Sequence, residues 1–415
     1  MDAGSGGRWN MTERRFRVLA IASHPVQYMS PIFRRMANHR KLDLLVAYCS
    51  LQGVRPAHDS EFNTSVQWDI PLLDGYEWVE VPNRSFGKMS FFRLLNPGIW
   101  RLMRRGNFDA VLCFTGYICA SFWIAYSTAK LTGVVFLFGT DATSLIPRDG
   151  RKWKVDLKKL FWPRLYALAD QVIVPSNGAR DLMISLGIPH DRITLTPYSV
   201  DNDWWRTESD RVDRLAVRSS WGADANSCVV LFCAKLQPWK RPLDLLHAFA
   251  RANVPNSILV FAGEGSLRES LQAEVVRLSV SDRVRFLGFV NQSQLPAVYS
   301  SSDLMVLPSE YEPFAVVVNE AACCGCPTIA SDQVGAARDL IASVNPKFIF
   351  PVRDVEALAS ILRAVLSDRL ALPEFGRAAQ KRMDLWSPSQ NIEATIQAIE
   401  AAVSRTGRRP QKLDP

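Results

Sequence analysis

The sequence predicts an α/β protein made of two doubly wound domains, each a parallel sheet covered by helices on both faces. At 415 residues the chain is longer than one hydrophobic core usually organises. Short apolar runs rich in β-branched and aromatic residues alternate with longer amphipathic stretches, as in successive strand and helix units. Residues 197–214 lose that pattern and gain charges and turn formers, which is typical of an interdomain linker. We therefore expect domains over residues 16–200 and 201–385.

Each half of the chain offers enough apolar runs for a sheet of its own. In the first half the expected strands are residues 17–22, 42–49, 110–114, 134–138, 171–175 and 193–197. In the second half they are residues 228–234, 257–263, 284–289, 304–308 and 327–331.

Both ends of the chain differ from these repeating units. Residues 1–15 contain no apolar stretch, so we expect a disordered segment and no secretory signal there. Near the other end Ser389 is a candidate helix cap, followed by Ile392, Ile396, Ile399 and Val403 at helical spacing. We expect this helix, residues 386–405, to cross back to the first domain, with a tail over residues 406–415.

The composition is that of an ordinary soluble protein, with 48% hydrophobic and 22% charged residues. The net charge of +8 is interspersed along the chain, which argues against a nucleic-acid-binding tail. Basic clusters at residues 14–17, 101–106 and 148–159 suit an acidic ligand or an anionic membrane surface, although a merely solvated basic face fits them equally well. No run reaches the roughly 18 apolar residues that a membrane span needs.

Cysteine usage points to the cytosol. The eight cysteines lie mostly in apolar runs, which favours reduced thiols. The "CCGC" run at residues 323–326 has no matching Cys or His pair at zinc spacing, so we expect it to pack in a core rather than bind metal.

Two acids eight residues apart, Glu312 and Glu320, flank an almost wholly apolar run. The apolar spacing predicts a helix over residues 314–325 that ends at Gly325. It follows the strand at 304–308, so its first turn belongs at the carboxyl edge of the sheet, where such domains bind ligands. Two acids so spaced could hold two separate hydroxyl-bearing groups of one ligand. Alone, the pair is also compatible with a favourable helix-start charge and a surface residue.

Basic side chains and glycines follow two other strands of the second half. Lys235 and Lys240 come after the strand at 228–234, and Gly263 and Glu264 follow the strand at 257–263. Lysines can neutralise a pyrophosphate, and glycine lets the backbone approach a ligand closely. Each signal is weak alone, but with the acid pair they describe a pocket for a nucleotide diphosphate sugar.

Taken together, "AKLQPWK", "FAGEGSL" and "SEYEPFAVVVNEAACCGCPTIASD" make the chain resemble the retaining glycosyltransferases of family 4. The resemblance is dense over residues 169–342 and implies the GT-B fold, two Rossmann-like domains facing across a cleft. It implies that Glu320 binds the ribose and that Glu312 contacts the donor sugar or assists the departing phosphate. It assigns the diphosphate to Lys235 and Lys240. The remaining implied donor contacts are Gly263, Glu264, Phe314 and Ala315.

The chain departs from the family pattern at several positions. Lys235 stands where Arg is frequent, which keeps the charge but removes a bidentate phosphate contact. Ala315 replaces a common glycine, which would tighten the sugar pocket. In the first domain the loop "SHPVQYMSP" replaces a usual glycine pair and brings His24 to the cleft. Asp141 follows the strand at 134–138. His24 and Asp141 are candidate catalytic residues, and a purely structural role is equally compatible with either.

The implied function is retaining transfer of a hexosyl group from a nucleotide diphosphate sugar to a glycan, glycolipid or other hydroxyl acceptor. We expect this in the cytoplasm, with peripheral contact to the inner face of the cell membrane as a further expectation, in polysaccharide or glycoconjugate synthesis. The resemblance implies no bound metal and no cofactor besides the donor, so "DND" at 201–203 is interpreted as an interdomain turn. The alternatives are a GT-B sugar-nucleotide epimerase and a non-catalytic sugar-nucleotide-binding protein.

Four aromatic residues of the first half could stack on an acceptor or pack in the core, and these are Trp68, Trp78, Phe91 and Phe92.

Overall fold

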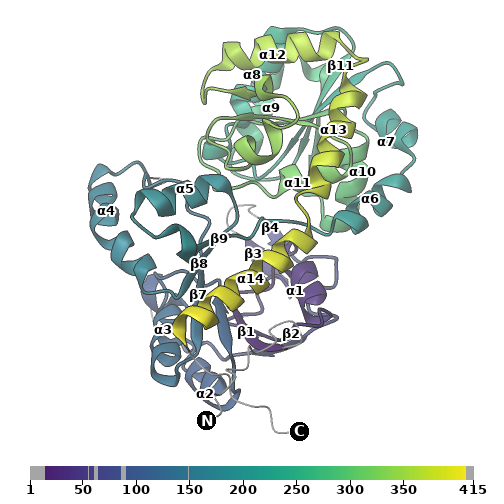
Figure 1. The fold of residues 1–415 in the computed structure, drawn as a ribbon. Helices are drawn as coiled ribbons and strands as arrows, with labels where there is room; N and C mark the ends of the chain where they lie inside the picture. Colours follow the sequence, from purple (N-terminus) through teal and green to yellow (C-terminus); the bar gives the residue numbers. More distant parts are fainter. Residues whose placement is uncertain (1–14, 55, 60–63, 86–89, 148, 408–415) are drawn as a thin grey trace, which may run out of the picture.

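The structure is a computed structural model that describes residues 15–54, 56–59, 64–85, 90–147 and 149–407. Within these residues the chain forms two parallel sheets, one in each of two domains (Figure 1). The predicted α/β class with two doubly wound domains is therefore confirmed.

The first sheet has the strand order β5-β2-β1-β6-β7-β8-β9, and every neighbouring pair is parallel. Its strands are β1 (Phe16–Ala22), β2 (Leu42–Tyr48), β5 (Glu77–Glu80), β6 (Ala110–Cys113), β7 (Val135–Gly139), β8 (Gln171–Val174) and β9 (Ile193–Leu195). A separate antiparallel pair consists of β3 (Ala57–Asp59) and β4 (Thr64–Val66). The α-helices of this domain are α1 (Met29–Ala37), α2 (Gly98–Arg105), α3 (Ala120–Thr132), α4 (Lys152–Ala167) and α5 (Asn177–Ser185).

The second sheet has the order β12-β11-β10-β13-β14-β15, again all parallel. Its strands are β10 (Cys228–Cys233), β11 (Ser257–Ala262), β12 (Val284–Gly288), β13 (Leu304–Leu307), β14 (Thr328–Ser331) and β15 (Ile349–Phe350). The α-helices are α6 (Asn202–Asp210), α7 (Arg214–Ser220), α8 (Pro242–Ala252), α9 (Arg268–Arg277), α10 (Leu295–Ser300), α11 (Val317–Cys323), α12 (Val355–Ser367), α13 (Leu372–Asp384) and α14 (Pro388–Thr406).

Three sequence expectations about helices need correction. The helix expected over 314–325 begins only at Val317, because Ala315 has a φ of +82°, which a right-handed helix does not accommodate. The segment expected as a linker, residues 197–214, contains helix α6, whose Trp205 is buried in the core of the second domain. The last helix is capped by Ser387 rather than Ser389, because Ser387 and Gln390 form a reciprocal capping box around Pro388.

The last helix, α14, belongs in space to the first domain. It runs across the lower domain in Figure 1, below the loop that follows α13. Its apolar face, formed by Ile392, Ile396 and Ile399, joins a core cluster of the first domain, where the helix packs against α1, β7, β8 and β9. At the crossing point, Trp386 donates its indole N–H to the carbonyl of Tyr198 at 2.7 Å. The chain thus passes between the domains twice at one place.

Polar contacts tie the two domains together on both sides of this crossing. Arg35 of α1 pairs with Asp201 and Asp203 at 2.6 and 2.8 Å, so the "DND" segment lies at the domain boundary. Elsewhere Asn177 donates to Asp339, and Asn291 donates to the carbonyl of Gln67 at 2.8 Å. These contacts fix the faces that the domains present to each other.

Candidate active site

A pocket of about 530 Å³ lies at the carboxyl end of the second sheet, where the second domain meets the first. Loops after β10, β11 and β13 form most of it, as expected for an open parallel sheet. It brings together most of the site residues predicted from the sequence, and these are Lys235, Lys240, Gly263, Glu312, Phe314, Ala315 and Glu320, with Asp141 from the first domain. Gln27, Tyr28 and Trp68 extend the wall on the first-domain side.

Two glycines allow the loops after β10 and β11 to lie against each other. A Cβ at Gly263, whose φ is +151°, would come within 2.0 Å of the carbonyl oxygen of Ala234. A Cβ at Gly265 would come within 2.6 Å of the carbonyl oxygen of Leu236. Only glycine permits this backbone approach, which places Lys235 beside the end of β11.

Glu312 and Lys240 form an ion pair at the pocket wall. Both side chains are mostly buried, with 16% and 17% of their surface exposed. The backbone around Glu312 is held by Gly335, whose N–H donates to the Glu312 carbonyl at 2.9 Å. A Cβ at Gly335 would clash with the carbonyl of Pro313 at 1.9 Å. The acid and the ammonium group are therefore held together at the surface of the pocket.

Glu320 occupies a deeper position on α11 and is only 6% exposed. The hydroxyl of Tyr299 donates to one carboxyl oxygen at 2.8 Å, and the amide of Gln292 lies 3.5 Å from the other. Burial raises the pKa of Glu320 to about 7, although both hydrogen bonds act to lower it. Sequence reasoning missed Tyr299 and Gln292, which no motif marks because they approach Glu320 only in the folded chain.

Glu264 does not belong to this group. It does not line the pocket, and its carboxylate pairs with Arg268 one helical turn further on, at 2.9 Å. Its carbonyl accepts the N–H of Leu236 at 2.8 Å, so this residue joins the two loops. The carboxylate of Glu264 thus has a structural partner in Arg268, and its contact with the donor stays a prediction.

The start of α11 borders the pocket, although the helix is shorter than expected. Val316 and Val317, where the helix begins, line the same pocket as Lys235 and Lys240. The free N–H groups of the first turn therefore lie on the side of the pocket and add to the positive charge of the lysines. Among the residues that the structure describes, no three His, Cys, Asp or Glu side chains gather closely enough to hold a metal ion.

A second cavity, of about 690 Å³, lies in the first domain and adjoins the first pocket. The two share a common boundary, formed by Tyr28, Asp141, Tyr198, Tyr311 and Pro313. Its far wall is aromatic, formed by Phe114, Tyr117, Phe138, Trp162 and Tyr166. The two cavities thus meet at the domain boundary, one charged and one mainly aromatic.

His24 and Asp141 both line this second cavity. Ser23 lies 3.0 Å from Nδ1 of His24, and burial, with the charge of Arg93, lowers the pKa of the imidazole, so it is neutral at pH 7. Asp141 is open to the cavity, yet the surrounding protein excludes enough water to raise the pKa of its carboxyl, and the charge of Glu312 adds to this. Of His24 and Asp141, only Asp141 also lines the first pocket.

Of the four aromatic residues predicted to stack on an acceptor, one lines a cavity and three do not. Trp68 lines the first pocket and packs on Phe289 of the second domain, with ring centroids 6.0 Å apart. Trp78, Phe91 and Phe92 line neither cavity. Phe91 and Phe92 pack edge to face on each other at the surface.

Two family models match the chain in tandem and cover both domains. The model of the glycosyl transferases group 1 matches residues 213–382, and that of glycosyltransferase family 4 matches residues 32–204. The chain belongs to these glycosyltransferases. The boundary between the two matches falls within α6, next to the point where the domains join.

Curated relatives of this family are similar to the chain over parts of their length. An uncharacterized glycosyltransferase of Methanocaldococcus jannaschii is 31% identical over 48% of this chain and 51% of its own. A D-inositol 3-phosphate glycosyltransferase of Geodermatophilus obscurus is 28% identical over 61% of this chain and 57% of its own. A glycogen synthase of Mycobacterium tuberculosis is 32% identical over 45% of each. The chain spans about half the length of the curated relatives it matches.

Solved structures place the fold among GT-B glycosyltransferases. HepE of Anabaena, crystallised with UDP and glucose, superposes with a TM-score of 0.70 and 17% identity, over 93% of this chain and all of the other. WaaG, a glycosyltransferase involved in lipopolysaccharide biosynthesis, gives a TM-score of 0.63 over 94% of this chain. At these identities the likeness concerns the fold, two Rossmann-like domains facing each other.

Proposed function

We propose that the protein transfers a hexosyl group, with retention of configuration, from a nucleotide diphosphate sugar to a hydroxyl group of an acceptor. One observation carries the proposal: two lysines, two glutamates and Asp141 surround a single pocket where the domains meet. The donor is expected in this pocket and the acceptor in the adjoining aromatic cavity. Transfer of the sugar from the donor to the acceptor would then take place at the shared boundary of the two cavities.

The donor fits the pocket by charge and by depth. The diphosphate carries negative charge, which Lys235 and Lys240 would neutralise as point charges. Glu320 lies deeper, where its carboxylate would accept hydrogen bonds from the ribose hydroxyls. Such bonds favour the ionised carboxylate, so donor binding is expected to lower the raised pKa of Glu320.

Transfer breaks the bond between the anomeric carbon and the diphosphate oxygen, and the electron pair leaves with the diphosphate. The acceptor oxygen attacks from the same face and forms the new bond, while its proton passes to the leaving diphosphate oxygen. No protein nucleophile is needed, so the protein acts by positioning the reactants and by stabilising charge on the phosphate. Lys240 would stabilise the leaving group, and Glu312 would hold Lys240 and contact the sugar.

Asp141 and His24 are proposed to act on the acceptor side. Asp141 lines both cavities, so its carboxylate is suited to orient the acceptor hydroxyl and to stabilise positive charge on the sugar carbon. His24 is neutral and offers a hydrogen bond within the aromatic cavity. The chemistry requires no metal, and turnover is expected to persist after treatment with EDTA because the lysines supply the positive charge.

The first test is release of nucleoside diphosphate from a panel of UDP-, GDP- and ADP-hexoses without acceptor. UDP-hexoses come first, since HepE was crystallised with UDP and with UDP-glucose. Binding of the right donor would raise the melting temperature of the folded protein. Turnover should be lost in Glu312→Ala and kept in Glu264→Ala, a matched acid beside the pocket but outside it.

The outcomes separate the alternatives. Donor binding without turnover in every case would indicate a non-catalytic sugar-nucleotide-binding protein. Conversion of the donor into its epimer, with no free sugar, would indicate an epimerase. A product whose NMR coupling constant at the anomeric proton shows inversion of configuration would contradict the retaining mechanism. The acceptor is expected to place the chain in polysaccharide or glycoconjugate synthesis. The structural neighbour WaaG is involved in lipopolysaccharide biosynthesis.

A further inference from the structure

Helix α4 leaves one apolar stripe uncovered. Trp153, Leu157 and Leu160 are 59%, 55% and 62% exposed, and Phe161 is 38% exposed. A helix turns 100° per residue, so these four side chains fall within a sector of about 100°. The core of the first domain uses a different face of the helix, since Trp162, Leu165 and Tyr166 are buried. Core packing therefore does not explain the stripe.

Basic side chains lie within and around this stripe. The same helical projection places Arg164 inside the stripe and Lys154 beside Phe161. Lys152 and Lys159 lie further round the helix on the other side, beyond Asp156, which is 3.9 Å from Lys159. Lys158 lies on the buried side, where it lines the aromatic cavity. Within α4, Asp156 is the one acidic residue against five basic residues. Lys154 is held by Asp149, just before the helix. A tryptophan and leucines on a helix with an excess of basic residues are typical of a helix that lies in a membrane interface.

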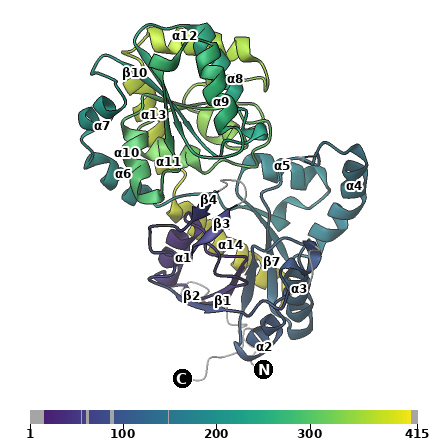
Figure 2. The same ribbon diagram turned by 180° about the vertical axis from the view of Figure 1, so that it is seen from behind.

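The helix occupies the outer margin of the first domain. It lies at the left edge in Figure 1 and at the right edge in the opposite view of Figure 2, away from the body of the protein. The buried face of the same helix supplies Trp162 and Tyr166 to the aromatic cavity. The Phe161 ring also packs on Tyr117, another cavity residue, with centroids 5.9 Å apart. The stripe and the cavity are therefore on two sides of one helix.

We propose that α4 docks the protein on an anionic bilayer, with its apolar stripe among the lipid headgroups and its lysines on their phosphates. Charge favours this occupant over a second copy of the chain, because two α4 helices would bring five basic residues each into one interface. Among the described residues no helix could cross a membrane. Docking through α4 is a peripheral contact and needs none.

The consequence for the substrate rests on the proposed function. If the cavity on the other side of α4 holds the acceptor, docking places that cavity about one helix diameter, roughly 10 Å, from the membrane surface. The head group of a lipid-linked hydroxyl acceptor could then reach the cavity while its lipid stays in the bilayer. Ile118, which lines the cavity and is 55% exposed, would extend the apolar entrance.

The test is co-sedimentation of the full chain with vesicles of neutral phosphatidylcholine, or of phosphatidylcholine with about 30% phosphatidylglycerol. We expect binding to the anionic vesicles that falls as salt rises from about 0.05 M to about 0.5 M. Leu157→Glu with Leu160→Glu should reduce binding at least about tenfold. Lys152→Glu with Lys159→Glu should reduce it and weaken its dependence on salt.

The matched control is Leu215→Glu with Leu370→Glu, two leucines that are 63% and 88% exposed in the second domain. It should bind vesicles like the wild type, and circular dichroism should show all variants folded. Equal binding by wild type and the α4 variants would overturn the proposal. A wild-type dimer in light scattering that becomes a monomer in the α4 leucine variant would also overturn it. Donor hydrolysis in the absence of vesicles tests the proposed function separately, and we expect the α4 variants to retain it.

Discussion

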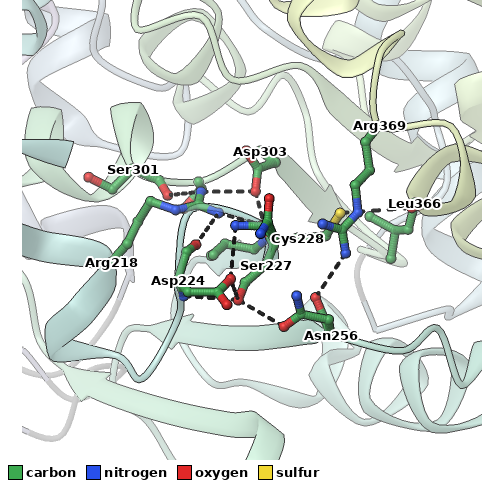
Figure 3. Close-up of polar contacts among 12 residues, drawn as sticks. Arg218, Asp224, Ser227, Cys228, Asn256, Ser301, Asp303, Leu366 and Arg369 are labelled. Carbon is green, nitrogen blue, oxygen red and sulfur yellow. Dashed lines mark hydrogen bonds and ion pairs between the residues drawn. The ribbon is translucent and has the colours of Figure 1, made fainter. Parts of the chain in front are cut away.

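Two groups of charged side chains lie at opposite ends of the second sheet, and they are held in different ways. At the amino end, Arg218 of α7 is 5% exposed and pairs with Asp303 at 3.0 Å. Its guanidinium also donates to the carbonyls of Ser301, Asp224 and Ser227 (Figure 3). This group, which we name the Arg218 cluster, joins α7 to the starts of β10 and β13.

The group at the carboxyl end, Lys235, Lys240, Glu312 and Glu320, borders an open pocket instead. The Arg218 cluster uses its hydrogen bonds inside the protein, so it stabilises the fold and offers nothing to a ligand. In the pocket, charged and titratable groups border a space of about 530 Å³ that a ligand can enter. Burial alone does not distinguish a structural charge from a functional one, and the presence of a cavity does. Each of the following substitutions tests that distinction.

The largest effect is expected for Arg218→Ala. Removing one partner of a buried pair leaves Asp303 uncompensated, which typically costs about 3–5 kcal/mol of unfolding free energy. Urea unfolding measures this loss. Arg211→Ala, which breaks an exposed pair with Glu208, should cost at most about 1 kcal/mol. The turnover of the Arg218→Ala molecules that remain folded should equal that of wild type, and a lower turnover would contradict a purely structural cluster.

Lys240→Ala should show the opposite pattern. Loss of an ammonium group that stabilises the leaving diphosphate is expected to lower kcat by about 10²–10³-fold. The melting temperature should fall less than in Arg218→Ala, because Glu312 borders the pocket and water can enter the space that Lys240 leaves. Steady-state transfer and a thermal melt, run beside the exposed control Lys347→Ala, measure both. If Lys240→Ala instead lowers the melting temperature while the folded molecules keep the wild-type kcat, then Lys240 has a structural role like Arg218.

Glu320→Gln should change how stability depends on pH. The folded protein holds this proton more tightly than the unfolded chain, because burial raises the pKa from 4.5 to about 7. The stabilising contribution of the neutral carboxyl is therefore complete below about pH 4.5 and is lost as the pH rises to about 7. The glutamine variant avoids that loss, so without ligand it should be more stable than wild type at pH 8, by up to about 3 kcal/mol.

Urea unfolding at pH 5 and pH 8 measures the change, with the exposed Glu269→Gln as control. The same variant should bind the donor more weakly, because an amide replaces the carboxylate that accepts the ribose hydroxyls. A gain in stability that is identical at both pH values would show that Glu320 does not titrate in this range.

The smallest effect is expected at Ala315, which has a φ of +82°. A left-handed conformation costs a non-glycine residue roughly 1–2 kcal/mol. Glycine removes that cost but loses more backbone entropy on folding, about 0.5–1 kcal/mol. Ala315→Gly should therefore stabilise the protein by about 0–1.5 kcal/mol in urea unfolding. Ala315→Val should destabilise it, and equal stability of both variants would mean that the backbone relaxes at this position.

The sequence predicted the regular parts of this fold well for a physical reason. Buried parallel strands such as β10 and β11 are continuous apolar runs, and such runs are visible without a structure. The edge strand β5, with the sequence EWVE, shows no such run and was missed. The pair β3 and β4 is short and also escaped prediction.

The site was predictable where a residue follows a strand in the same segment of chain. Lys235, Lys240 and Glu312 follow strands directly, so their place at the sheet edge could be inferred. Glu264 also follows a strand, but its carboxylate pairs with Arg268, the first residue of α9, and this pairing could not be seen in the strand pattern. Tyr299 reaches Glu320 from a neighbouring helix, α10, and only the tertiary packing reveals it.

Helix α14 has a consequence for how the protein is made. Its apolar residues complete the core of the first domain, yet they lie about two hundred residues beyond that domain's last strand. A ribosome adds roughly 5–20 residues per second, so the nascent first domain would wait about 10–40 seconds with the part of the sheet that α14 covers still exposed. A chaperone that shields this face during synthesis would have a defined target, and separate expression of the first domain should yield an aggregation-prone fragment.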